Sequence, residues 1–179
     1  QPEAHNKNRV LVLDRNAHPA LKSSGIQFIE ARHDACSQSS PEEAEIIRGL
    51  VTSLLAQRYR DKEGIEHPIG LENILVVAPY NAQVNLLRRV LPAGSRVGTV
   101  DKFQGQEAEV VIVSMTTSSG DYLPRFMDFL YSKNRLNVAI SRARSLAIVV
   151  ANPDLLTIPC RTPEDMALVN TLCWVRDYA

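Results

Sequence analysis

Three arginines stand within eleven residues in the stretch NRLNVAISRAR, which runs from Asn134 to Arg144. They are Arg135, Arg142 and Arg144, and they precede the apolar run SLAIVVA. Lys plus Arg and Asp plus Glu both total 20, so the chain has no net charge and this basic cluster is local. An arginine fork suits a phosphate because it is planar and permanently charged. The alternative is a solvated helix face whose cations complement the helix C-terminus.

A second polar stretch, GTVDKFQGQEAEVVIVS, runs from Gly98 to Ser114. Thr99, Asp101 and Glu107 stand around Gly105, between two apolar runs. A glycine there permits a tight loop and a close approach of the backbone to a ligand. Hydroxyl and amide groups here could then meet phosphate or sugar oxygens. The alternative is an ordinary connection in which Asp101 serves as a cap.

A third stretch, VVAPYNAQ, places Tyr80 directly after an apolar run. In open α/β sheets, ligands bind outside the carboxyl ends of the strands. The ring of Tyr80 offers a flat face on which a base could stack. The alternative is a tyrosine packed at the corner between a strand and a helix.

Apolar runs typical of strands alternate with helical patterns along most of the chain. The expected strands lie within RVLVLD, GIQFIEA, NILVVAPY, RVGTV, VVIVSM and SLAIVVA. The expected helices run from Ser40 to about Tyr59, from a cap at Asn81 to Pro92, from Tyr131 to Arg144, and onward from a cap at Thr162. This alternation predicts one parallel α/β sheet covered on both faces.

The first expected helix has the strongest start signal. Ser40 suits the N-cap, Pro41 the first helical position and Glu43 the third position of a capping box. Polar residues follow that helix in RDKEGIEHPIG, where Gly and Pro predict an irregular connection.

Several kinds of site are missing from the sequence. No glycine is followed by lysine, so there is no P-loop, and there is no G-x-G-x-x-G fingerprint of a stand-alone Rossmann enzyme. The spacing of Cys36, Cys160 and Cys173 fits neither a zinc site nor a disulfide framework, which favours a reducing, cytoplasmic location. We expect no metal ligands, no membrane segment and no hydrolysis of a nucleoside triphosphate by this chain alone.

Together the three polar stretches resemble motifs IV, V and VI of the second RecA-like domain of superfamily 1 helicases, in the Upf-like, Dna-type branch. The matched motifs occupy roughly residues 74–156. The resemblance implies a three-layer α/β/α domain of the P-loop NTPase type over residues 25–179 that lacks its own P-loop. Residues 1–24 would link it to an upstream domain.

The resemblance also implies roles for single residues. Arg142 matches the arginine finger that reaches the γ-phosphate, Tyr80 a residue that stacks on adenine, and Glu107 an acid near the ribose. The other matched positions are Gln83, Gly105 and Arg135 at the nucleotide cleft, and Thr99 and Asp101 facing the nucleic-acid strand.

The implied cofactor is ATP, with Mg²⁺ held by the N-terminal RecA-like domain that precedes this one. The implied partners are that domain and a single strand, DNA in preference to RNA. A narrower similarity, carried by LVVAPYNAQV and CRTPEDM, is to bacterial proteins that fuse a RecB-like nuclease to such a helicase. The sequence therefore predicts the C-terminal motor domain of a helicase. The alternative is a non-catalytic nucleic-acid-binding or scaffold module that keeps the fold.

Overall fold

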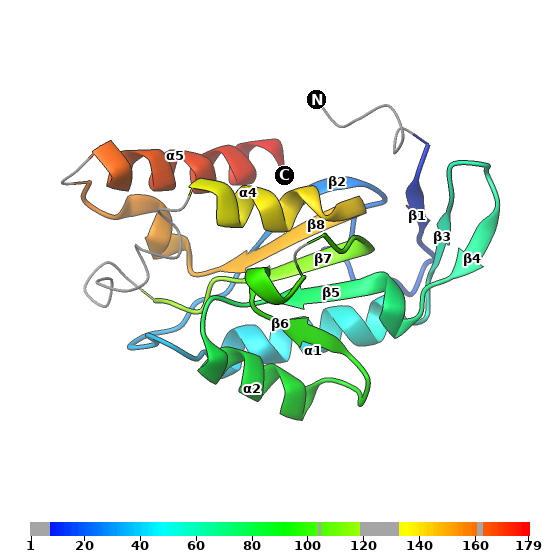
Figure 1. Cartoon of the computed structure of the whole chain (residues 1–179), viewed down its shortest axis with the longest axis horizontal. Coiled ribbons are helices and arrows are strands. Elements are labelled where there is room, and N and C mark those ends of the chain that lie inside the picture. The colour runs from blue at the N-terminus through cyan, green and yellow to red at the C-terminus, as the bar shows by residue number, and fades with distance from the viewer. Residues whose placement is uncertain (1–7, 104, 119–132, 161–162) are drawn as a thin grey trace.

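The computed structural model describes residues 8–103, 105–118, 133–160 and 163–179. Five parallel strands form the central sheet in the order β2-β8-β7-β5-β6 (Figure 1). They are β2 (Gly25–Glu30), β5 (Ile74–Val77), β6 (Arg96–Gly98), β7 (Ala108–Ser114) and β8 (Ala143–Ala151). All residues of β5 and β7 are buried, because both faces of the sheet are covered. The predicted parallel α/β fold is confirmed.

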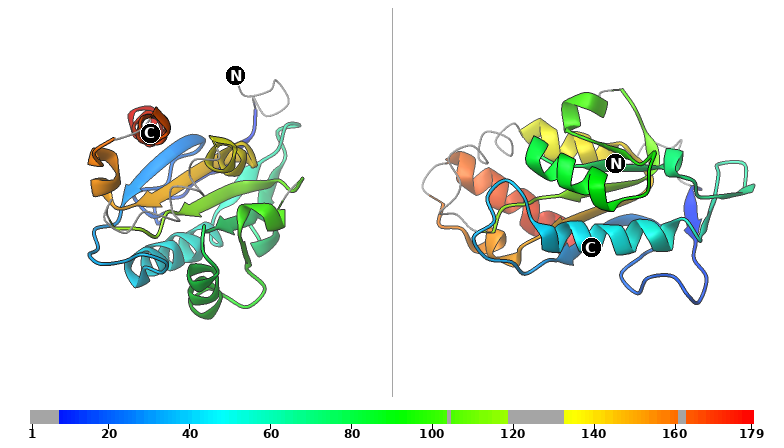
Figure 2. Two further views of the ribbon diagram at one scale, coloured as in Figure 1. Left: turned by 60° about the vertical axis from the view of Figure 1, so that its left-hand side comes forward. Right: turned by 90° about the horizontal axis from the view of Figure 1, so that it is seen from below.

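In the part of the chain that the structure describes, two helices cover each face of the sheet (Figures 1 and 2). α1 (Pro41–Leu54) and α2 (Asn81–Val90) lie on one face, and α4 (Lys133–Ser141) and α5 (Pro163–Tyr178) on the other. Short 3-10 helices lie between these elements: η2 (Leu71–Asn73), η3 (Val100–Phe103) and η5 (Pro153–Thr157). The alternating side chains of the strands therefore enter two separate apolar cores, one under each helix pair.

The start of α1 follows its sequence signal only in part. The hydroxyl of Ser40 accepts a hydrogen bond from the N–H of Glu43 at 3.1 Å, as an N-cap should. The N–H of Ser40 instead donates to Oε1 of Gln83 at 2.8 Å, so the carboxyl group of Glu43 does not close a capping box. That carboxyl group turns into the domain, where it meets other polar groups.

The predicted end of α1 near Tyr59 is wrong, because the chain leaves the helix at Leu54 and enters a hairpin. β3 (Arg58–Arg60) pairs antiparallel with β4 (Glu66–Pro68), and β1 (Val10–Val12) adds the third strand of this small sheet. Oδ1 of Asp61 accepts hydrogen bonds from the N–H groups of Glu63 and Ile65. This local carboxyl-to-backbone bonding organises a turn where the sequence suggested an irregular connection.

Residues 8–24, the described part of the predicted linker 1–24, pack against the rest of the domain. Leu11 and Leu21 are buried in the core under α1. The N–H of Asp14 donates to Oε1 of Gln57 at 2.7 Å, and Arg9 pairs with Glu109 on β7. Residues 8–24 therefore share a core with the residues after Gly25. Among the described residues, no helix combines the length and apolarity that crossing a bilayer requires.

Candidate functional site

Parallel strands give the sheet two chemically distinct edges. The carboxyl edge carries Tyr80 after β5, Thr99 after β6, and Ser114 with residues 115–118 at and after the end of β7. Glu107 and Arg142 immediately precede β7 and β8, so they lie at the amino edge. The predicted site residues are thus divided between opposite ends of the sheet.

The amino edge carries a cluster of charged side chains from three separate segments. We call Arg9, Glu107, Glu109, Arg142 and Arg144 the amino-edge cluster. Nε of Arg144 donates to Oε2 of Glu107 at 3.0 Å, and Nη1 of Arg144 lies 3.8 Å from Oε1 of Glu109. Glu109 is buried, and its Oε1 also accepts from Nη1 of Arg9 at 2.6 Å. Each glutamate of the cluster is therefore paired with an arginine.

Arg142 occupies the turn between α4 and β8, not the helix predicted to reach Arg144. Its N–H donates to the carbonyl of Ala139, and its own carbonyl accepts from the N–H of Ala108 on β7. The residue is half-buried. Within the described ranges its guanidinium forms no ion pair. The backbone of Arg142 is therefore fixed at both sides, and no described carboxyl group neutralises its charge.

Gly105 shapes the connection that leads to Glu107. Its φ of +78° lies in the left-handed region, which favours glycine, and beyond its two chain neighbours no described residue has an atom within 4 Å of the position that a Cβ would occupy. The turn, not crowding, therefore requires this glycine. The open space beside it is compatible with the predicted close approach of a ligand.

Arg135 and Asp101 form a pair away from the amino edge. Nη2 of Arg135 lies 3.4 Å from Oδ2 of Asp101, and both side chains are exposed. Arg135 is in the first turn of α4 and Arg142 follows the last, which separates them by roughly 10 Å of helix rise. The structure thus groups Arg135 with Thr99 and Asp101, the residues predicted to face the strand, rather than with Arg142.

The predicted pairing of Tyr80 with the nucleotide residues needs correction. Ile74–Val77 pair with Val110–Val113, so Glu107 and Tyr80 lie beyond opposite ends of that paired segment. At about 3.3 Å per residue the two are on the order of 20–30 Å apart, too far for one nucleoside to touch both. The ring is half-buried against the core; burial raises the pKa of the phenol, and a hydrogen bond with Thr117 offsets part of that rise.

Gln83 supports the fold instead of facing a ligand. Its side chain is completely buried, its Oε1 accepts from the N–H of Ser40, and its Nε2 donates to the carbonyl of Ser40 and to the hydroxyl of Ser114. Every polar atom of the amide is used. A direct contact of Gln83 with a nucleotide would require these bonds to break, so the structure gives this residue a structural role.

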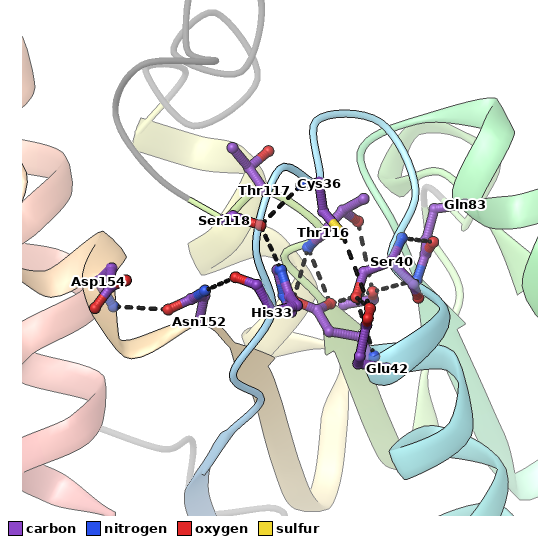
Figure 3. Close-up of polar contacts among 12 residues, drawn as sticks. His33, Cys36, Ser40, Glu42, Gln83, Thr116, Thr117, Ser118, Asn152 and Asp154 are labelled. Carbon is purple, nitrogen blue, oxygen red and sulfur yellow. Dashed lines mark hydrogen bonds and ion pairs between the residues drawn. The ribbon is translucent and has the colours of Figure 1, made fainter.

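A buried polar network at the carboxyl edge was not anticipated from the sequence (Figure 3). Its centre is the carboxyl group of Glu43, which accepts from the hydroxyl of Ser114 at 2.5 Å and from the N–H of Thr116 at 2.9 and 3.0 Å. Nε2 of His33 lies 3.0 Å from the same group. Glu43 falls on the apolar face of α1, one turn before Ile47, and that position was the available signal.

The network holds a strained backbone. Thr116 has a φ of +73°, which is rare for a β-branched residue and costs on the order of 1–3 kcal/mol. Its N–H donates to both carboxyl oxygens of Glu43. Two residues further on, Oγ of Ser118 lies 2.6 Å from Nδ1 of His33. The segment that follows β7 is therefore fixed by side chains from α1 and from the residues after β2.

Ser118, His33 and Glu43 are joined by successive contacts, as in a Ser-His-acid hydrolytic triad, but they do not form a working one. Ser118 is buried, and its oxygen already accepts the N–H of Cys36 at 2.9 Å. A nucleophile must be accessible to its substrate.

In the described part of the chain, no three His, Cys, Asp or Glu side chains are grouped so that they could hold a metal ion.

Comparison with known proteins gives a consistent picture. A family model described as AAA domain matches residues 4–154. RNA helicase Mov10l1 of Mus musculus is 35% identical over 158 residues, which cover 83% of this chain and 13% of the relative. DNA polymerase alpha-associated DNA helicase A of Schizosaccharomyces pombe is 37% identical over 119 residues, which cover 65% of this chain and 16% of the relative. The chain therefore spans less than a fifth of these relatives.

Proposed function

This chain belongs to the AAA domain family, and on that premise we propose that it is the second RecA-like motor domain of an ATP-dependent helicase of superfamily 1, in the Upf-like branch. An upstream RecA-like domain would supply the P-loop and hold Mg²⁺. ATP would bind between the two domains and draw them together, and hydrolysis would release them. Repeated closure would move the protein along a single strand.

The observation that carries this proposal is the charge balance of the amino-edge cluster. Arg9 and Arg144 are each paired with a glutamate, whereas Arg142 has no ion-pair partner among the described residues. An arginine whose backbone is fixed and whose guanidinium forms no ion pair with a described residue suits the phosphate that is transferred. Glu107 and Gly105 stand on the same edge, where they would adjoin the sugar and the phosphates.

The carboxyl edge supplies the proposed strand track. Thr99, Asp101 and Arg135 lie there with Tyr80, whose ring would meet a base of the strand instead of the adenine of ATP. Contacts of this kind would be independent of sequence and sensitive to salt. Two ligands would thus use opposite edges of one sheet, linked by α4, which carries Arg135 in its first turn and ends just before Arg142.

The test is the strand-stimulated ATPase of the full-length polypeptide. Arg142→Ala should lower kcat by about 10³- to 10⁵-fold, the effect of an arginine finger in well-studied NTPases. Arg142→Lys should recover only part of the loss, because an ammonium group lacks the planar fork. Arg48→Ala, on the exposed face of α1, is the matched control. Near-normal turnover of Arg142→Ala would refute the assignment.

The rival is a nucleic-acid-binding or scaffold module without motor activity. It predicts that the full-length polypeptide binds a single strand but shows no strand-stimulated hydrolysis. The relatives are named as RNA and as DNA helicases, so the same assay with matched oligonucleotides tests the proposed preference for DNA. Mg²⁺-dependent cleavage of the oligonucleotide would support the proposed fusion to a RecB-like nuclease, and its absence would count against that fusion.

A further inference from the structure

Arg144 is a member of the amino-edge cluster to which the proposed reaction gives no direct part. It lies on β8, and its guanidinium connects two glutamates of very different exposure. The side chain of Glu107 is 48% exposed, whereas that of Glu109 is 2% exposed. One arginine therefore ties a surface carboxyl group to a buried one.

Glu109 is a fixed anchor for this connection. Its Oε1 accepts from Arg9 at 2.6 Å, and its Oε2 accepts from the hydroxyl of Ser145 at 2.9 Å. It lies in the first residues of β7, where the pairing with β8 shifts register between Ala108 and Val110. Such irregularities re-aim a side chain in a sheet. With two hydrogen-bond partners and a buried side chain, Glu109 places a fixed negative charge 3.8 Å from Nη1 of Arg144.

The hydrogen bond from Arg144 occupies only one of the two carboxyl oxygens of Glu107. Its Oε2 accepts from Arg144, while its Oε1 forms no hydrogen bond with any described residue. An untethered surface glutamate samples several rotamers and must lose that freedom when it binds a ligand. Holding one oxygen removes much of this cost and leaves the other oxygen to accept a hydrogen bond from a hydroxyl group.

We propose that Arg144 is a positioning residue: anchored on Glu109, it orients Glu107 toward the sugar of the bound nucleotide and so sets a preference for a sugar with hydroxyl groups. This inference rests on the proposed function, in which Glu107 adjoins the ribose. The competing explanation is an ordinary surface ion pair, which contributes little. The two differ in what they predict for the sugar.

The experiment measures kcat and KM of the full-length polypeptide with ATP and with 2′,3′-dideoxy-ATP. The wild type should prefer ATP about tenfold in kcat/KM, as expected for one hydrogen bond to a charged group. Glu107→Gln should lose most of the preference, because a neutral amide oxygen accepts a hydrogen bond more weakly than a carboxylate. Arg144→Gln should remove most of it, through KM rather than kcat, because the lost contact is equal in the ground and transition states. Arg144→Lys should restore part of it.

Two further variants make the result decisive. The double variant Glu107→Gln/Arg144→Gln should be no worse than Glu107→Gln alone, because coupled residues act through one contact. Arg48→Gln breaks a comparable exposed Arg–Glu pair on α1 and should leave the sugar preference unchanged. Arg144→Gln should also fold normally, since Glu109 keeps its closer partner Arg9; a thermal melt followed by circular dichroism checks this.

The outcomes separate the two proposals. A wild-type polypeptide without strand-stimulated ATPase overturns the proposed function and the inference with it. An active enzyme in which Glu107→Gln loses the sugar preference and Arg144→Gln keeps it overturns the positioning role alone. A fall in kcat for Arg144→Gln without any change in sugar preference overturns it as well.

Discussion

Glu43 provides the most direct test of how the carboxyl edge is held together. Replacing it with Ala removes the acceptor for the N–H of Thr116, the hydroxyl of Ser114 and Nε2 of His33, in a site with no exposed surface. Leaving one buried group unsatisfied costs about 1–3 kcal/mol. Ser114 keeps Gln83 and His33 keeps Ser118 as partners. We therefore expect Glu43→Ala to lower the free energy of unfolding by about 3–5 kcal/mol.

Glu43→Gln should cost less, about 1–2 kcal/mol. The amide oxygen can still accept the N–H of Thr116. The amide nitrogen faces His33, which can change tautomer so that Nε2 accepts and Nδ1 donates to Ser118. The graded loss from Gln to Ala distinguishes lost hydrogen bonds from a lost charge alone.

Urea denaturation of the chain, followed by far-ultraviolet circular dichroism, measures these differences. The single tryptophan, Trp174, is 48% exposed, so its fluorescence would be a poor reporter of unfolding. Glu45→Ala is the matched control, because Glu45 lies on the exposed face of the same helix and its carboxyl group bonds to Arg48 and to no other described side chain. Glu45→Ala should leave the midpoint of urea denaturation unchanged. A loss of less than about 1 kcal/mol for Glu43→Ala would show that the network does not hold this edge.

Two other predictions concern the chain by itself. Purified residues 1–179 should release no phosphate from ATP, with or without an oligonucleotide; turnover like that of a complete helicase would show that the site is not shared with another domain. The hairpin should weaken in acid: a hydrogen bond from His67, then one from the N–H of Ile65, holds the pKa of Asp61 below its usual 3.8. Because the pKa of Asp61 is lower in the folded than in the unfolded state, this stabilisation is complete at a pH above the unfolded-state pKa. It is lost as the pH falls through the folded-state pKa. Amide chemical shifts of Ile65 should report that loss in the wild type and not in Asp61→Asn.

The fold was predictable because its signals are local and agree with each other. The short, β-branched apolar runs of β5 and β7 favoured strands buried on both faces, and Ser40 with Pro41 marked the start of α1. The hairpin of β3 and β4 was missed because its turn depends on one side chain, Asp61, accepting two backbone N–H groups. Gly and Pro in that stretch indicated only that a regular helix must stop.

The site was less predictable, although part of its geometry was within reach. Strand direction alone implies that Tyr80, which follows a strand, and Glu107, which precedes one, lie at opposite edges of a parallel sheet. Assigning both to one nucleotide overlooked that constraint. The pairings that define the amino edge were not accessible in the same way: Arg9 and Glu109 are 100 residues apart, and Arg144 joins Glu107 only because β8 lies beside β7. Spacing therefore identified residues that can bind phosphate or sugar, whereas sheet order decided which of them act together, and Arg142 stands out only after its neighbours are seen to be paired.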